Sequence, residues 1–197
     1  MTLVFATNNQ HKIEEVRSVL PPSLNIITLR EAGIDIDIPE PHDTLEANAR
    51  EKAATIAKMC GANCFSEDTG LEVTALDGEP GVRSARYSGD GRSPADNIVK
   101  LLGRLEGRNN RSARFRTVIC LLLDGSEHLF EGICPGRIAD AADGADGFGY
   151  DPIFIPDGSS TTFARMSLAE KNSYSHRRKA MDKLVAFLNT LPLKRES

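Results

Sequence analysis

An apolar run leads into a polar turn in Leu3-Val4-Phe5-Ala6-Thr7-Asn8-Asn9, and this stretch decides the fold. Such a run predicts a buried strand, and the turn is typical of the start of a helix. Apolar residues then recur at helical spacing until Pro21-Pro22, where a helix must end. Residues 24–29 are apolar enough for a second strand. A strand, a helix and a strand in this order predict an α/β protein.

The rest of the chain alternates between helical and strand patterns. Helices are expected at residues 43–60, 94–105 and 175–191, the first with Asp43 and Glu46 as a capping box. Two β-rich segments on either side of Asp124-Gly125 predict a central hairpin. The remaining expectations are strands at 63–66, 71–76, 113–123, 127–134 and 153–155, loops at 31–41, 67–70 and 136–151, and a frayed tail at 193–197.

Composition limits the classes of protein to consider. The chain has 197 residues, of which 40% are hydrophobic and 26% charged, and its formal net charge is −4. These are globular values, and we expect a single domain over residues 1–197. The acidic balance argues against general nucleic-acid binding, and no segment has the apolar length of a membrane span. Without a signal-peptide pattern or a Cys-x-x-Cys pair, we expect reduced cysteines in a cytoplasmic protein.

Basic side chains lie in the first turns of two predicted helices, where the positive end of the helix dipole disfavours them. Lys12 has such a position in the first helix, and residues 176–179 have it in the last, with Lys171 just before them. A bound phosphate would make these positions favourable, because helix N-termini and lysines together bind anions. Alternatively, the side chains point into water, where salt screens the penalty. Both helices break the rule in the same direction, which favours a phosphate site.

Carboxylates are expected near the same region. Glu67-Asp68 follows the strand predicted at residues 63–66, and ligands bind at strand ends in α/β proteins. Glu40 lies in a proline-flanked loop. Two or three carboxylates suffice for Mg²⁺, which can sharpen a water nucleophile while an adjacent carboxylate takes the proton. A solvated acidic turn is the alternative interpretation of this spacing.

An aromatic and glycine-rich segment, residues 147–152, is a candidate base pocket. Glycines let the backbone approach a flat ligand, and Phe148 or Tyr150 could stack on a nucleobase. Phe154 is a further candidate for stacking. The alternative is a turn whose aromatic side chains fill the core.

Five motifs in a fixed order resemble the inosine triphosphate pyrophosphatase family over nearly the whole chain. They are Thr7-x-Asn9-x-x-Lys12, Ser66-Glu67-Asp68-Thr69-Gly70-Leu71, Pro80-Gly81 with Ser84-Ala85-Arg86-Tyr87, Gly147-Phe148-Gly149-Tyr150-Asp151-Pro152, and Glu170-Lys171-Asn172 with Ser175-His176-Arg177. The resemblance implies an elongated α/β fold with a mixed sheet, two lobes around a cleft, a homodimer and Mg²⁺ as cofactor.

The resemblance also implies roles for individual residues. Asp68 is the expected general base, and Glu40 and Asp68 are the expected metal ligands, with Glu67 as a candidate helper. The residues expected to bind the triphosphate are Thr7, Asn8, Asn9, Gln10, His11, Lys12, Lys52, Thr69 and Lys171. The residues expected to bind the base are Phe148, Gly149, Tyr150, Asp151, His176 and Arg177.

The resemblance therefore implies an enzyme that hydrolyses dITP, ITP and XTP to the monophosphate and pyrophosphate. Asp68 would deprotonate a water that attacks the α-phosphorus, and Arg177 with the loop backbone would donate to the oxygen at position 6 of the base. A Maf-like pyrophosphatase with a pyrimidine or modified-base preference and a nucleotide-binding regulator without catalysis remain alternatives. The expected partner is a small nucleoside triphosphate, with no nucleic acid and no membrane.

Overall fold

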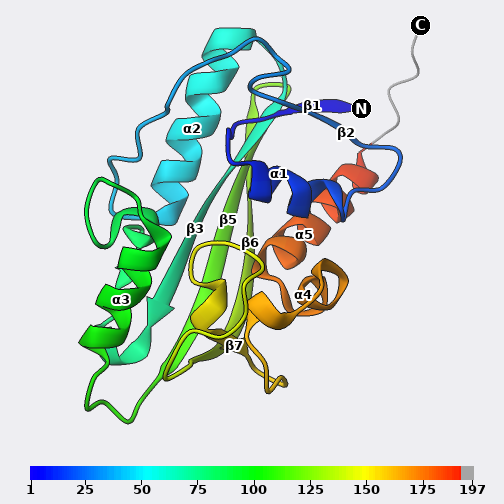
Figure 1. Cartoon of the computed structure of the whole chain (residues 1–197). Coiled ribbons are helices and arrows are strands. Elements are labelled where there is room, and N and C mark those ends of the chain that lie inside the picture. The colour runs from blue at the N-terminus through cyan, green and yellow to red at the C-terminus, as the bar shows by residue number, and fades with distance from the viewer. Residues whose placement is uncertain (192–197) are drawn as a thin grey trace, which may run out of the picture.

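One curled β-sheet organises residues 1–191, the part of the chain that the computed structural model describes (Figure 1). The predicted tail at 193–197 lies outside the described residues. The strand order is β2-β1-β3-β5-β6-β7, with β4 paired to β3. The strands are β1 (Thr2–Phe5), β2 (Asn25–Thr28), β3 (Cys64–Val73), β4 (Pro80–Gly81), β5 (Ser112–Leu123), β6 (Ser126–Ile138) and β7 (Phe154–Pro156).

The sheet is mixed because its two halves are connected differently. β1 pairs in parallel with β2 and β3, since helices cross over between them. β3, β5, β6 and β7 pair antiparallel, and β5 and β6 form the predicted central hairpin. The helices are α1 (Gln10–Arg17), α2 (Leu45–Cys60), α3 (Pro94–Arg104), α4 (Leu168–Tyr174) and α5 (His176–Thr190). The predicted α/β class is confirmed.

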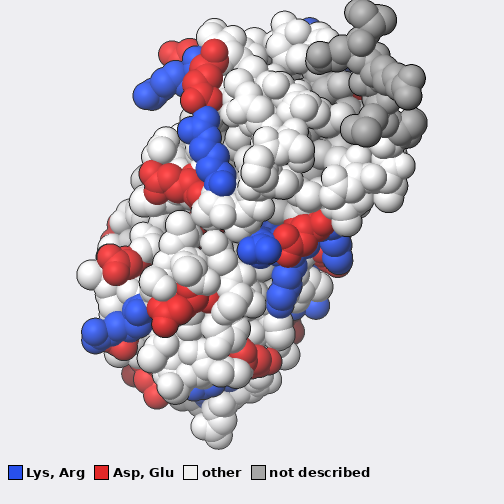
Figure 2. Space-filling view, turned by 90° about the vertical axis from the view of Figure 1, so that its right-hand side faces the viewer, with Lys and Arg blue, Asp and Glu red and all other residues white. Residues whose placement is uncertain are grey.

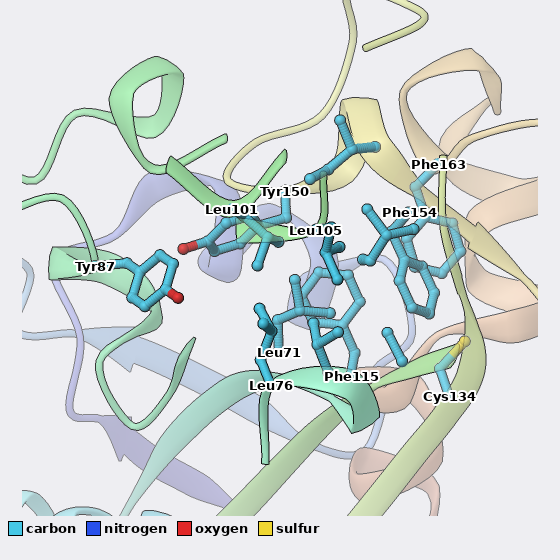
Figure 3. Packing of buried hydrophobic residues seen from close by; sticks show 14 of the residues in the cluster. Leu71, Leu76, Tyr87, Leu101, Leu105, Phe115, Cys134, Tyr150, Phe154 and Phe163 are labelled. Carbon is cyan, nitrogen blue, oxygen red and sulfur yellow. The ribbon is translucent and has the colours of Figure 1, made fainter. Parts of the chain in front are cut away.

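Helices cover both faces of the sheet (Figure 1). Successive side chains of a strand point to opposite faces. On β3, Phe65 packs in a cluster with residues of α1 and α5, whereas Cys64 packs in a cluster with residues of α2. A third cluster lies farther along β3 and β5, where Leu71 and Phe115 pack with Leu101 of α3 (Figure 3). Among the described residues, no helix is long and apolar enough to cross a membrane.

β3 corrects the prediction of two short strands separated by a loop at 67–70. It is one ten-residue strand, and β5 pairs with it continuously from Cys64 to Val73. The polar residues Glu67 and Asp68 therefore lie inside a strand, where both are buried. Buried charges of this kind need partners from other elements. β6 likewise extends to Ile138, into the segment predicted as loop.

The start of α2 also differs from the prediction. Thr44, not Asp43, is the N-cap, and its side chain accepts a hydrogen bond from the Ala47 N–H. The Glu46 carboxylate pairs with Arg116 of β5 instead of closing a capping box. A long-range ion pair has replaced the local contact that the spacing suggested.

Gly132 allows α5 to lie directly on β6. A Cβ atom added there would lie 2.0 Å from the His176 carbonyl oxygen and 2.5 Å from the Ala180 nitrogen. Both are backbone atoms, so no rotamer change can relieve the clash. We expect Gly132→Ala to lower the free energy of unfolding by about 1–3 kcal/mol, measured by urea denaturation. Gly103→Ala, in α3 with open space around it, is the control and should be neutral or stabilising; equal stability of both variants would contradict close α5 packing.

Candidate active site

A cleft of about 670 Å³ opens beside the middle of β3. β1 pairs with β3 only as far as Phe65, and β4 begins to pair at Leu71. Between these two pairings, the described chain places no strand along this edge of β3. Side chains from both faces of β3 can therefore reach this cleft. The predicted site residues that line the cleft are Asn9, His11, Lys12, Glu40, Asp68, Thr69, Phe148, Gly149, Tyr150, Asp151, Lys171, His176 and Arg177.

Several predicted phosphate-binding residues shape the turn before α1 and do not line the cleft. The Thr7 hydroxyl accepts from the Asn9 N–H, and the Asn8 amide donates to the Ile36 carbonyl. The Gln10 side chain bonds within α1. These contacts fix the path of the chain from β1 into the helix.

The first turn of α1 presents Lys12 to the cleft. The Asn9 side chain caps the helix by accepting from the Lys12 N–H at 3.2 Å. The Lys12 ammonium lies 3.1 Å from a carboxylate oxygen of Glu67, and its side chain is only 18% exposed. The alternative interpretation, in which Lys12 points into water, is therefore wrong. Its position at the helix N-terminus is compensated in part by a buried carboxylate of the protein.

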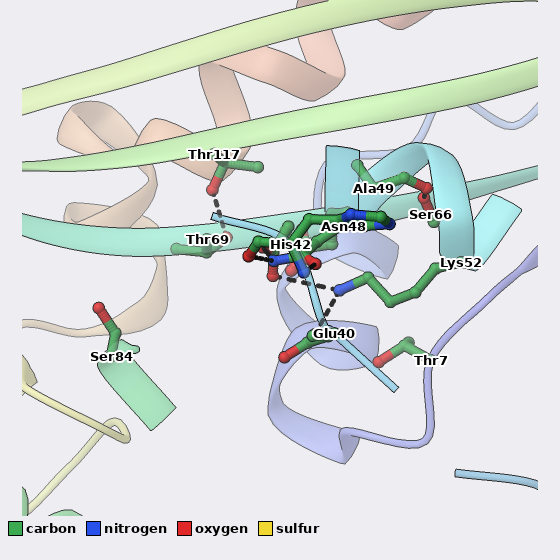
Figure 4. Close-up of polar contacts among 12 residues, drawn as sticks. Thr7, Glu40, His42, Asn48, Ala49, Lys52, Ser66, Thr69, Ser84 and Thr117 are labelled. Carbon is green, nitrogen blue, oxygen red and sulfur yellow. Dashed lines mark hydrogen bonds and ion pairs between the residues drawn. The ribbon is translucent and has the colours of Figure 1, made fainter. Parts of the chain in front are cut away.

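The ammonium group of Lys52 contacts Glu40 (Figure 4). Asp68 pairs with the same ammonium group. The Lys52 Nζ donates to Glu40 Oε1 at 2.5 Å and to Asp68 Oδ1 at 3.1 Å. The other Asp68 oxygen accepts from the Asn48 amide at 3.2 Å. Lys52 and Asn48 lie one turn apart on α2, so the helix holds both partners against this face of β3. Lys52 supports the two carboxylates from behind and does not line the cleft.

Burial and the neighbouring charges shift the pKa values of Glu40 and Asp68 in opposite directions. Burial raises the pKa of Asp68 above its usual value, Lys52 opposes the rise, and Glu40 adds to it. Burial acts on Glu40 as well, but Lys52, Lys12 and Arg86 together outweigh it and lower the pKa of Glu40. Asp68 is therefore the carboxylate of the pair that takes up a proton more readily. A general base needs this property.

Glu40 and Asp68 are also the residues that could hold Mg²⁺. A hard divalent cation takes carboxylate oxygens and keeps several waters, so two cleft-facing carboxylates fit it. Residues 1–191 contain no group of three or more His, Cys, Asp or Glu side chains that could hold a metal ion. Glu67 fits less well than predicted, because both of its oxygens are already paired, with Arg177 and Lys12.

A buried ion network lies on the other face of β3. Arg177 donates to both oxygens of Glu67, at 2.7 and 2.9 Å, and to Glu15. The Lys171 ammonium donates to Glu15 and to Asp151, at 2.6 Å each. All five side chains are at least nine-tenths buried. Burial would raise the pKa values of Glu15 and Glu67, but Arg177 and the neighbouring lysines outweigh it and lower both.

The network changes the interpretation of the basic residues around α5. Arg177 and His176 line the cleft, but Arg178 pairs with Asp182, and Lys179 donates to a carbonyl of β6. Half of the predicted cationic turn therefore does not belong to the site. The structure also places Lys171 in α4, a helix absent from the sequence prediction. The Ser167-x-x-Glu170 capping box was a signal for it.

Glu15 is a site-supporting residue that the sequence analysis missed. Its carboxylate joins Lys171 of α4 to Arg177 of α5. The available signal was a charge beside Val16 on the buried face of α1. A carboxylate in that position needs a buried cation.

The aromatic segment divides into core and cleft residues. Tyr150 belongs to the third core cluster (Figure 3). Its hydroxyl donates to the Ser84 carbonyl at 2.9 Å. Phe154 is fully buried against Phe115. Phe148 is half-buried at the cleft and stacks on the His11 ring. Phe148 is therefore the stacking candidate whose ring lies at the cleft, while Tyr150 and Phe154 fill the core.

The loop that carries Phe148 is fixed by Asp151, whose carboxylate accepts from the Phe148 N–H at 2.8 Å. Gly147 has a φ of +79°, and a Cβ there would lie 2.3 Å from the same carboxylate. Glycine is therefore required for this close approach. Burial raises the pKa of Asp151, while Lys171 opposes the rise.

His176 lines the cleft and has one buried side-chain atom without a hydrogen-bond partner among the described residues. Its ring is 3% exposed and stacks on Phe115. Burial and the nearby cations Arg177 and Lys171 place its pKa well below the usual value, so the imidazole is neutral. Within residues 1–191, its Nδ1 is the buried side-chain nitrogen or oxygen without a hydrogen-bond partner.

Comparison with known proteins gives matches over nearly the whole chain. The model of the Ham1 family matches residues 3–187. The dITP/XTP pyrophosphatase of Flavobacterium psychrophilum is 50% identical over 187 residues, covering 95% of this chain and 98% of that protein. The Ham1 protein of Staphylococcus aureus has a similar structure, with a TM-score of 0.87, 40% identity, and coverage of 96% of this chain and 98% of that chain. A HAM1 protein from Coxiella burnetii gives a TM-score of 0.88 at 34% identity, covering 97% and 100%.

Proposed function

The chain belongs to the Ham1 family, and we propose that it hydrolyses non-standard purine nucleoside triphosphates such as dITP, ITP and XTP to the monophosphate and pyrophosphate. The name of the Flavobacterium relative, a dITP/XTP pyrophosphatase, supports this substrate class. One observation about the site carries the proposal. A single cleft joins Lys12, Glu40 and Asp68 to Phe148 and His176, which provides groups for a phosphate chain and for a base.

The proposed chemistry centres on Asp68. Its carboxylate, held by Lys52 and Asn48, takes the proton from a water that attacks the α-phosphorus. Mg²⁺ held by Glu40 and Asp68 would neutralise phosphate oxygens and make the attacking water more acidic. The bond from the α-phosphorus to the bridging oxygen breaks, and pyrophosphate leaves. Positioning and electrostatic stabilisation would account for most of the rate enhancement.

The first turn of α1 would stabilise the leaving pyrophosphate. Lys12 faces the cleft, and the unpaired N–H groups of the helix start favour negative charge. Glu67 holds the Lys12 ammonium in place. Lys171 is better placed for the base end, because its ammonium lies 5.0 Å from the centre of the Phe148 ring. Lys171 would therefore act near the base and not at the phosphates, unlike its predicted role.

Base selectivity would come from donors that need an oxygen at position 6. Phe148, Arg177 and His176 all line the same cleft. Adenine presents an amino group at position 6, so a donor that pairs with hypoxanthine or xanthine would be left unpaired. Unpaired buried donors can produce large discrimination between substrates.

The direct test is a turnover panel with and without Mg²⁺. We expect pyrophosphate release from ITP, dITP and XTP at a kcat/KM at least about a hundredfold above that for ATP, and loss of activity in EDTA. Faster turnover of UTP or dUTP would instead indicate a pyrimidine preference. Tight ITP binding without pyrophosphate release would identify a nucleotide-binding regulator. Equal rates with ITP and ATP would reject the selectivity argument alone.

Nucleic-acid binding finds no support on the face shown in Figure 2. Basic and acidic side chains are intermixed there and form no continuous basic surface. A nucleic-acid binder gathers Lys and Arg on one face to contact phosphates. A cytoplasmic homodimer with two lobes remains part of the proposal, and light scattering would test the dimer.

A further inference from the structure

His11 covers the ring that the proposed function assigns to base stacking. The centroids of the His11 and Phe148 rings are 5.2 Å apart, and the ring planes differ by 8°. Nearly parallel planes cannot be farther apart than their centroids. A base stacked between the rings needs contact distances of about 3.5 Å on each side, or about 7 Å in all. No base fits between His11 and Phe148 in this arrangement.

The other neighbours of the Phe148 ring cannot give way easily. The Lys171 ammonium and the Arg177 guanidinium lie 5.0 and 5.7 Å from its centre. Both are buried and paired with carboxylates, so moving either would leave buried charge without a partner. The His11 side chain is exposed, and within the described part of the chain it makes no hydrogen bond or ion pair. His11 is therefore the neighbour that can be displaced.

We propose that His11 is a displaceable cover on Phe148, which an incoming purine replaces by stacking on the same ring. Only the side chain has to rotate, because Asn9 fixes the backbone of this turn through the Lys12 and Ile13 N–H groups. Each nucleotide that stacks on Phe148 must first displace the imidazole, whereas a ligand without a base need not. A cover on Phe148 is a different role from the phosphate binding predicted for His11 from the sequence. The proposal rests on the proposed function, since it requires a nucleobase in the cleft.

The test compares a ligand that has a base with one that does not. In His11→Ala, we expect the KM for ITP to fall roughly two- to tenfold, the equivalent of one aromatic contact. The inhibition constant of inorganic tripolyphosphate should stay unchanged, because this ligand does not reach Phe148. His128→Ala is the matched control, since His128 packs on Phe187 with ring centroids 4.2 Å apart and does not line the cleft. The control should leave both constants as in the wild type.

A second measurement reports the cover directly. In the wild-type protein, ring protons of His11 should show an upfield NMR shift caused by Phe148. Adding ITP should remove the shift, and adding tripolyphosphate should leave it.

Three results would overturn the proposal. The KM for ITP could rise or stay the same in His11→Ala, ITP and tripolyphosphate could weaken together, or the His11 shift could persist with ITP bound. Weakening of both ligands would place His11 among the phosphate-binding residues. Failure of the proposed function looks different, because the wild-type protein itself would then release no pyrophosphate from ITP.

Discussion

Asp68→Asn is expected to lower kcat for ITP by about a hundred- to ten-thousandfold, the range for loss of a general base. Asparagine keeps the size of the side chain but cannot take a proton from water. The fold should persist, because Lys52 keeps its 2.5 Å contact with Glu40 and an amide oxygen can still accept from Lys52. Single-turnover pyrophosphate release measures the loss, and circular dichroism with thermal melting reports the fold.

The control for this variant is Asp43→Asn, which neutralises an exposed carboxylate just before α2. It should retain wild-type turnover and stability. Near-normal turnover of Asp68→Asn, with the control unchanged, would remove Asp68 from the mechanism as the general base.

Arg177→Met should produce the largest loss of stability, about 3–5 kcal/mol of unfolding free energy. Arg177 is 2% exposed and pairs with Glu67 and Glu15. Methionine fills part of the volume but leaves each buried carboxylate with only a lysine partner. Urea denaturation at pH 7 measures the difference. ITP turnover should fall as well, because Arg177 lines the base end of the cleft.

A double variant distinguishes the loss of stability caused by unpaired charge from the loss caused by poorer packing. Adding Glu67→Gln to Arg177→Met removes one of the two stranded charges, so we expect recovery of part of the lost stability, with a coupling energy of about 1–3 kcal/mol. Glu67→Gln alone should destabilise the protein, because it leaves Arg177 with fewer acceptors. If the double variant is no more stable than Arg177→Met, the loss comes from packing and not from unpaired charge.

The pH dependence of Arg177→Met follows from the same pair. In the wild type, the pKa values of Glu15 and Glu67 are lowered, so their stabilising contribution is complete above the unfolded value near 4.3 and is lost as the pH falls below it. Without Arg177, burial acts with less opposition and should raise both pKa values. The stability gap between variant and wild type should therefore be widest near pH 7 and narrow toward pH 4. A gap that does not change with pH would contradict this explanation.

Strong local patterns in the sequence were sufficient to predict much of the fold. The two β-rich segments on either side of Asp124-Gly125 predicted the β5–β6 hairpin correctly. The prediction of a loop in the middle of β3 was wrong. Glu67 and Asp68 are unfavourable in a buried strand unless distant partners neutralise them. The partner of Glu67, Arg177, is 110 positions away in sequence. No local pattern reveals such a pairing.

The candidate site shows the same limit. Basic residues in the first turns of α1 and α5 predicted that both helices contribute to a binding site. Residues of both helices line one cleft. The sequence suggested a bound phosphate as their counter-charge. In the structure, Lys12 and Arg177 form ion pairs with Glu67, and Lys171 forms an ion pair with Glu15. Which anion compensates a cation depends on tertiary packing, which residue spacing along the chain does not specify.

The separation of Glu15 and Arg177 in sequence also affects when the protein can fold during its synthesis. They lie 162 positions apart, so a ribosome working at 5–20 residues per second makes the arginine about 8 to 32 s after the glutamate. Until then, the α1 segment carries a carboxylate that is buried in the folded protein, without Arg177, one of the two cations that pair with it. The nascent chain should therefore be unable to complete this buried network, and to bind a nucleotide in the cleft, until α5 has been synthesised.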